Sequence, residues 1–104
     1  MKTANIKIKT NNNSYSIIIG NNLIKNLIKI IKKKSLDFNQ CLIIVDTKVP
    51  KILLKKILLS LANKNYSIFF FNSSEKNKNI TYVNKIINIL LKKNFHRNDC
   101  LISL

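Results

Sequence analysis

The apolar positions of the chain change their spacing along the sequence, and each change predicts a new element. Apolar and polar residues alternate over residues 5–9, where Ile6 and Ile8 fall on one face, as in a half-buried strand. Three asparagines follow, and asparagine tolerates the left-handed backbone of a turn. A second apolar run over residues 14–19 then leads to Gly20, the chain's one glycine. These two runs predict a β-hairpin.

Three later segments place their apolar residues on one face of a helix, at spacings of three and four residues. Asn21 or Asn22 can cap the start of the first, and Pro50 suits the first turn of the second. Lys32–Lys34 and Lys92–Lys93 end the first and third, where cations complement the helix dipole. The predicted helical stripes cover residues 23–31, 53–62 and 82–91.

Short apolar runs separate these helices and predict buried strands over residues 41–45, 67–71 and 100–104. The first run is continuously apolar, as is typical of a strand covered on both faces of a parallel sheet. Strand and helix alternate, which specifies βαβ crossovers. The predicted fold is therefore α/β, a Rossmann-like parallel sheet with flanking helices behind an N-terminal β-hairpin. Because the last run is expected to be a core strand, we expect residues 1–104 to be an incomplete domain.

Composition adds limits on location and partners. No apolar run reaches the roughly 18 residues that span a bilayer, and the chain opens without a signal-like segment, so we expect a cytoplasmic protein without a membrane partner. The net charge of +15 invites a nucleic-acid interpretation. However, a single residue, Arg97, is arginine, and the lysines are dispersed, so we expect no specific nucleic acid. Cys41 and Cys100 lie in apolar runs and are interpreted as small core residues.

Two loops follow the carboxyl ends of predicted parallel strands, where α/β sheets bind ligands. Asp46 follows the first buried strand and could accept a ribose hydroxyl or cap the next helix. Glu75 and Lys78 follow the next strand and could contact a nucleotide or form an exposed ion pair. A GxGxxG fingerprint is impossible with one glycine. His96 is interpreted as a loop histidine, and residues 97–99 as a salt-bridged turn.

The ordered set of motifs resembles the N-terminal part of the 3-dehydroquinate synthase family. It comprises Ser14-Tyr15-Ser16-Ile17 with Ile19-Gly20, then Glu75-Lys76-Asn77-Lys78, then Arg97-Asn98-Asp99 with Leu101-Ile102-Ser103-Leu104. Members of that family carry a SYPI-I-G hairpin strand, a GExxKS loop and an RDxxLIALGGGVxGD segment in this order. The resemblance covers essentially the whole chain. Ser74 stands where the family usually has glycine, which strains the loop if glycine's conformational range is needed there, and Asn79 replaces a serine or threonine that caps a helix.

This resemblance implies an NAD-binding role on the adenosine side of the cofactor. The residues that it assigns to cofactor binding are Asp46, Ser73, Ser74, Glu75, Lys76, Asn77 and Lys78. It assigns no catalytic residue and no metal ligand to this chain. In the family, a helical C-terminal domain supplies the glutamate and two histidines that bind a divalent metal, zinc or cobalt, and we expect that domain to be missing from residues 1–104.

The implied reaction is that of a lyase of the shikimate pathway, which leads to chorismate and the aromatic amino acids. It converts a phosphorylated sugar acid, 3-deoxy-D-arabino-heptulosonate 7-phosphate, to 3-dehydroquinate and phosphate. Members are often homodimers. We expect these 104 residues alone to be inactive and to bind NAD weakly at best. A glycerol-dehydrogenase-like enzyme of the same superfamily, a small basic nucleic-acid-binding protein and an isolated interaction module are the alternatives.

Overall fold

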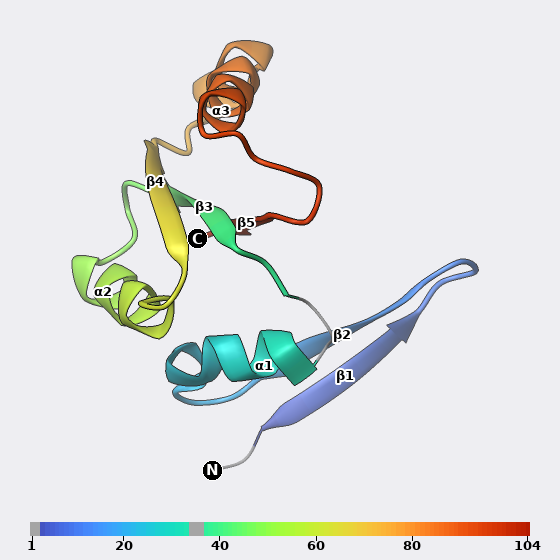
Figure 1. The fold of residues 1–104 in the computed structure, drawn as a ribbon. Helices are drawn as coiled ribbons and strands as arrows, with labels where there is room; N and C mark the ends of the chain where they lie inside the picture. The colour runs from blue at the N-terminus through green and yellow to red at the C-terminus, as the bar shows by residue number, and fades with distance from the viewer. Residues whose placement is uncertain (1–2, 34–36) are drawn as a thin grey trace.

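The computed structural model describes residues 3–33 and 37–104 (Figure 1). Lys34, which was expected to help end the first helix, lies outside these ranges. Within them, none of the helices combines the length and the apolar character needed to cross a bilayer. The elements in chain order are β1 (Ala4–Lys9), β2 (Ser14–Ile19), the 3-10 helix η1 (Leu23–Asn26), α1 (Leu27–Lys33), β3 (Gln40–Asp46), α2 (Lys51–Ser60), β4 (Asn65–Phe71), the 3-10 helix η2 (Glu75–Asn77), α3 (Ile80–Lys92) and β5 (Cys100–Ser103).

Strand β3 is the centre of a three-stranded parallel sheet in the order β4-β3-β5. Ile43 pairs with Ile68 of β4 and with Ile102 of β5. Helix α2 connects β3 to β4, and α3 connects β4 to β5, so both connections are βαβ crossovers. The predicted fold class, a parallel sheet with flanking helices preceded by an antiparallel hairpin, is confirmed.

The hydrophobic core lies between β3 and helices α1 and α2. Cys41, Ile43 and Val45 alternate along β3 toward these helices, and each is at most 1% exposed. Leu42 points to the opposite face and is 0% exposed, so the strand is covered on both sides as its apolar run predicted. The core side chains packed with β3 are Phe38, Ile57 and Leu61, with partly buried Leu27, Ile28, Ile31, Leu54 and Leu58 around them.

Helix α3 lies on the other side of the sheet from α1 and α2 (Figure 1). The sequence predicted one broad apolar stripe for it, but the structure divides this stripe. Tyr82 and Ile86 are turned inward, whereas Val83, Ile87 and Leu91 remain 47%, 45% and 70% exposed. Each exposed residue follows an inward one, so it lies about 100° further round the helix.

The hairpin pairs β1 with β2 in antiparallel register, for example Ile6 with Ile17 and Ile8 with Tyr15. Its turn is closed by Thr10, whose backbone N–H donates to the Asn13 carbonyl at 2.7 Å. The face that carries Ile6, Tyr15 and Ile17 is largely exposed. It is therefore less buried than the alternating pattern predicted.

Four expectations about helix ends can be compared with the structure. Asn22 precedes η1 with a left-handed backbone (φ 57°) and makes no capping hydrogen bond to that helix through its side chain. Pro50 is the residue before α2, one position earlier than predicted. Asn79 does cap α3, because its side-chain oxygen accepts a hydrogen bond from the Tyr82 backbone N–H at 3.2 Å. Lys32 and Lys33 lie in the last turn of α1, as expected.

Candidate nucleotide-binding site

The carboxyl ends of β3 and β4 lie side by side and bring the two predicted binding loops together. Asp46, the last residue of β3, is the register partner of Phe71, the last residue of β4. The pairing continues one residue further, since the Thr47 N–H donates to the Phe71 carbonyl at 3.0 Å. Side chains that are far apart in sequence therefore converge at this edge, as the parallel topology requires.

The Asp46 carboxylate joins the two loops. One of its oxygens accepts a hydrogen bond from the Lys48 backbone N–H at 3.0 Å, and the other accepts from the Ser73 hydroxyl. The hydrogen bond from Ser73 is the main reason that the pKa of Asp46 is held below its ordinary value, and the bond from Lys48 lowers it further. An ionised carboxylate has about four acceptor positions, so Asp46 can still accept from a ligand hydroxyl.

The loop that follows β4 is held mainly by its own hydrogen bonds. Asn77 donates through its side chain to the Asn72 carbonyl at 2.9 Å, and Asn79 donates in the same way to the Lys76 carbonyl at 2.7 Å. Ser74 has φ −93° and ψ 155°, an extended conformation that any residue adopts. The serine that replaces the family's glycine therefore causes no backbone strain at this position.

Glu75 and Lys78 form the ion pair that the sequence left open as the alternative to a nucleotide contact, with an N–O separation of 3.2 Å. The Glu75 side chain is 90% exposed and that of Lys78 is 59% exposed, so water and salt screen the attraction. Lys76 is also exposed, and Asn77 is half-buried. No hydrogen bond in the described part of the chain joins this ion pair to Asp46 and Ser73.

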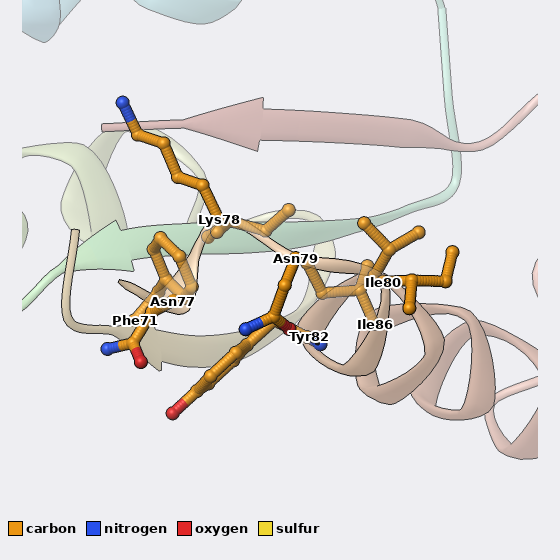
Figure 2. A pocket seen from close by; sticks show the side chains of 9 residues that line it. Phe71, Asn77, Lys78, Asn79, Ile80, Tyr82 and Ile86 are labelled. Carbon is orange, nitrogen blue, oxygen red and sulfur yellow. Dashed lines mark hydrogen bonds between the residues drawn. The ribbon is translucent and has the colours of Figure 1, made fainter. Parts of the chain in front are cut away.

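A pocket of about 500 Å³ lies next to the Asp46 edge, between α3 and the sheet. Its walls are mainly apolar, and Phe71 and Tyr82 meet edge to face there with ring centres 5.1 Å apart. Lys78 and Tyr82 extend from it in different directions (Figure 2). Its volume lies within the range of small-molecule sites, although other pockets of this chain are as large. Sequence reasoning did not identify Phe71 and Tyr82 as possible site residues, although Phe71 directly precedes the 72–79 loop and the Tyr82 N–H is capped by Asn79.

His96, Arg97 and Asp99 lie at the opposite end of the sheet, before β5. Asp99 accepts hydrogen bonds from the His96 backbone N–H at 2.7 Å and from the Gln40 side chain at 3.0 Å, and the first is the main reason that its pKa is lowered. In the described residues no ion pair joins Arg97 to Asp99. The turn is therefore held by backbone hydrogen bonds, and the predicted salt bridge was wrong.

The remaining chemically active side chains do not form a metal centre. Residues 3–33 and 37–104 contain no group of three or more His, Cys, Asp and Glu side chains that could hold a metal ion. Cys41 is buried in the core as predicted, and burial raises the pKa of its thiol to about 11. The basic charge is distributed over several elements, with lysines on β1, α1, α2 and α3.

Comparison with known proteins places this geometry in context. No family model matches the chain. It is 56% identical over 99 residues to a 3-dehydroquinate synthase of Pelagibacter ubique, covering 95% of this chain and 27% of that protein. It is 29% identical over 102 residues to a 3-dehydroquinate synthase of Prochlorococcus marinus, covering 95% of this chain and 28% of that protein. The chain thus spans about a quarter of the length of these curated relatives.

Solved structures give a matching result for the fold. The structure of a 2-deoxy-scyllo-inosose synthase in complex with carbaglucose-6-phosphate, NAD+ and Co2+ superimposes with a TM-score of 0.80. The match covers 94% of this chain and 26% of that one, at 15% sequence identity, so it supports the fold alone. Sequence and fold together confirm that the chain resembles the N-terminal part of 3-dehydroquinate synthases.

Proposed function

We propose that the chain is the NAD-binding N-terminal part of a 3-dehydroquinate synthase. The observation that supports this most strongly is the 56% identity to the Pelagibacter synthase over 99 residues. The alignment covers 95% of the chain, so it spans both loops at the candidate site. The alternating order of strands and helices is consistent with the proposal. In sheets of this kind nucleotides bind beyond the carboxyl ends of the strands, and here those are the ends of β3 and β4.

In this proposal Asp46 accepts hydrogen bonds from the ribose hydroxyls on the adenosine side of NAD. The carboxylate is ionised at neutral pH, its lowered pKa keeps it ionised at more acidic pH than an ordinary aspartate, and the bonds from Ser73 and Lys48 fix its orientation. A fixed, charged acceptor is an effective partner for a ligand hydroxyl. The residues of the 73–78 loop form the neighbouring wall, with Lys78 as a cation for the pyrophosphate and Glu75 as a further acceptor.

The pocket beside Asp46 could receive the base of the same nucleotide. Its apolar wall includes Phe71 and Tyr82, whose rings offer flat surface to a planar base. Asn77 and Lys78 also line it and can donate hydrogen bonds to ring nitrogens or phosphate oxygens. The site therefore combines a ribose acceptor, a cation and aromatic surface within one region.

When bound, NAD supplies transient oxidation of a substrate carbinol, which acidifies the neighbouring hydrogen and allows phosphate to leave. The contribution of this chain is to bind and orient the adenosine half of the cofactor. The structural neighbour was crystallised with NAD+, Co2+ and a phosphorylated sugar analogue, which supports NAD, a divalent metal such as zinc or cobalt, and a phosphorylated sugar acid as the ligands of the whole enzyme. We assign no metal ligand to residues of this chain.

The proposal has wider consequences for the whole enzyme. It would be a lyase of the shikimate pathway, acting in the cytoplasm on 3-deoxy-D-arabino-heptulosonate 7-phosphate, and it would work as a homodimer. Residues 1–104 would form part of its NAD-binding domain, and a helical domain elsewhere in the enzyme would carry the metal and substrate sites.

A chimeric enzyme tests the proposed function. The 104 residues of this chain replace the aligned segment of the Pelagibacter synthase, and the purified chimera is assayed for release of phosphate from the sugar acid. We expect NAD-dependent turnover within about tenfold of the parent, since the replaced segment keeps 56% of its residues. A folded, dimeric chimera without turnover would count against the proposal. The parent synthase and a chimera with Ile43→Asp in the core serve as positive and negative controls.

A further inference from the structure

Cys41 and Cys100 are register partners in adjacent parallel strands, although they are far apart in sequence. Cys41 lies in β3 and Cys100 in β5, and the pairing is direct. Register partners in a parallel sheet point to the same face, and here both side chains belong to the core layer. Neighbouring strands run about 4.8 Å apart, which falls within the roughly 4.4–6.8 Å that separates the Cα atoms of disulfide-bonded cysteines.

The two thiols differ in their access to solvent. Cys41 is 0% exposed in the centre of the sheet. Cys100 is partly exposed and lines a surface pocket of about 290 Å³ that also includes Phe38 and the turn around Arg97. A disulfide reagent can therefore reach Cys100 first. The buried Cys41 thiol can react only afterwards, with the mixed disulfide that has formed on Cys100.

The two strands also differ in length and in pairing within the described residues. Strand β3 is held by neighbours on both sides, whereas β5 pairs with β3 alone in the described part of the chain. Strand β5 is also short, spanning Cys100–Ser103.

We propose that Cys41 and Cys100 form a dithiol that closes to an intramolecular disulfide when it meets a small peptide disulfide such as oxidised glutathione. The Cys100 thiolate attacks one sulfur of the glutathione disulfide and releases the first glutathione thiolate. Cys41 then attacks the Cys100 sulfur of the mixed disulfide and releases the second glutathione. The two thiol protons go to the two released thiolates, so the protein loses two hydrogens and the oxidant becomes two thiols.

Two physical features affect the rate of this exchange. The net charge of +15 attracts an anionic peptide disulfide to the chain. Burial raises the pKa of both thiols, and the neighbouring Cys100 thiol adds to the effect at Cys41, so little thiolate is present at neutral pH. Closure is therefore expected to be slow at neutral pH, and the test is best carried out in mildly alkaline buffer.

The disulfide would tie β5 to β3, the middle strand of the order β4-β3-β5. The closed loop contains roughly 60 residues, including α2, β4 and α3, so it restricts the unfolded chain strongly. In the oxidised protein β5 could not separate from β3, and the two strands would unfold together with the core.

The test uses the reduced full chain, incubated with oxidised glutathione and analysed by intact mass and by thiol counting. We expect the wild type to lose two hydrogens and both of its thiols without dimerising. Cys41→Ala should stop at a stable glutathione adduct on Cys100, and Cys100→Ala should keep its thiol while folded. Far-ultraviolet circular dichroism checks that each variant folds.

A second readout uses the wild type alone, in case a variant does not fold. A non-reducing digest should yield one cross-linked peptide pair containing Cys41 and Cys100, and the oxidised protein should melt at a higher temperature than the reduced protein. The proposal is overturned if the folded wild type keeps both thiols, if it accumulates the glutathione adduct without closing, or if the linked cysteines come from different molecules.

Discussion

The side chains of Asp46 and Ser73 are separated by 27 positions in the sequence and are joined by a hydrogen bond at the carboxyl ends of β3 and β4. This contact fixes one loop of the candidate nucleotide site against the other. It also stabilises the ionised carboxylate, so the same bond that joins the two loops lowers the pKa of Asp46.

Replacing Ser73 should change the titration of Asp46. In Ser73→Ala, the pKa of Asp46 should rise toward its ordinary value, because the largest cause of its lowering is removed while the weaker bond from Lys48 remains. Carboxyl chemical shifts followed by NMR through an acid titration measure this pKa. Ser14→Ala on the hairpin is the control and should leave the titration of Asp46 unchanged, and an unchanged pKa in Ser73→Ala would mean that the hydrogen bond is not formed in solution.

Acid should destabilise the fold through three aspartates. The pKa values of Asp37, Asp46 and Asp99 are lowered by hydrogen bonds from Lys64, Ser73 and the His96 backbone respectively. The unfolded chain therefore takes up protons at a higher pH than the folded chain does. The stability that these groups contribute is complete above their unfolded pKa of about 3.9 and is lost as the pH falls through their folded values.

Urea unfolding measured at a series of pH values tests this expectation. The free energy of unfolding should fall below a pH of about 4, and Asp99→Asn should reduce the slope because one titrating group is removed. A stability that stays constant over the acid range would contradict the hydrogen-bonding partners assigned to these carboxylates.

Asn79 should stabilise the start of α3. Its side chain accepts from the Tyr82 N–H and donates to the Lys76 carbonyl, so it caps the helix and fixes η2 to it. Asn79→Ala should lower the free energy of unfolding by about 1 kcal/mol, whereas Asn79→Ser, which can still cap, should lose much less. Equal stability of the two variants in thermal unfolding would show that the cap contributes nothing.

The core around β3 should dominate stability. Ile43 is 0% exposed and packs against α1 and α2, so Ile43→Ala should cost about 2–5 kcal/mol through lost burial and a cavity. Leu59 is 76% exposed on α2, and Leu59→Ala should change the free energy of unfolding by no more than about 0.5 kcal/mol. Denaturant titration compares the two, and similar losses in both variants would contradict the assignment of the core.

Much of this structure could be predicted from spacing alone. The continuous apolar run from Cys41 to Val45 predicted a doubly covered strand, and it became the centre of the sheet. The helical stripes predicted the three α-helices of the described residues, because their apolar period depends only on local geometry, although residues 23–26 of the first stripe form the 3-10 helix η1. At the site, the order of the elements was enough to place Asp46 and the 73–78 loop at the same edge.

The remaining features depend on contacts between distant residues. The pairing of Cys41 with Cys100 follows from the strand register, which no local pattern specifies. The exposure of Leu91 depends on how α3 sits on the sheet, and the contact of Phe71 with Tyr82 depends on the path of the loop between them. The prediction of a salt bridge within residues 97–99 was wrong because the Asp99 carboxylate accepts hydrogen bonds from the His96 backbone N–H and the Gln40 side-chain amide instead.

The most direct test of the central claim is the Michaelis constant for NAD of the chimeric synthase and of its Asp46→Asn variant. The variant keeps the shape of the side chain but removes the charge that we propose for the ribose hydroxyls, so we predict that the Michaelis constant rises about tenfold or more. Asp37→Asn, which changes an aspartate in the loop before β3, should leave the constant unchanged. An active chimera in which Asp46→Asn binds NAD as tightly as its parent would contradict the assignment of this edge as the cofactor site.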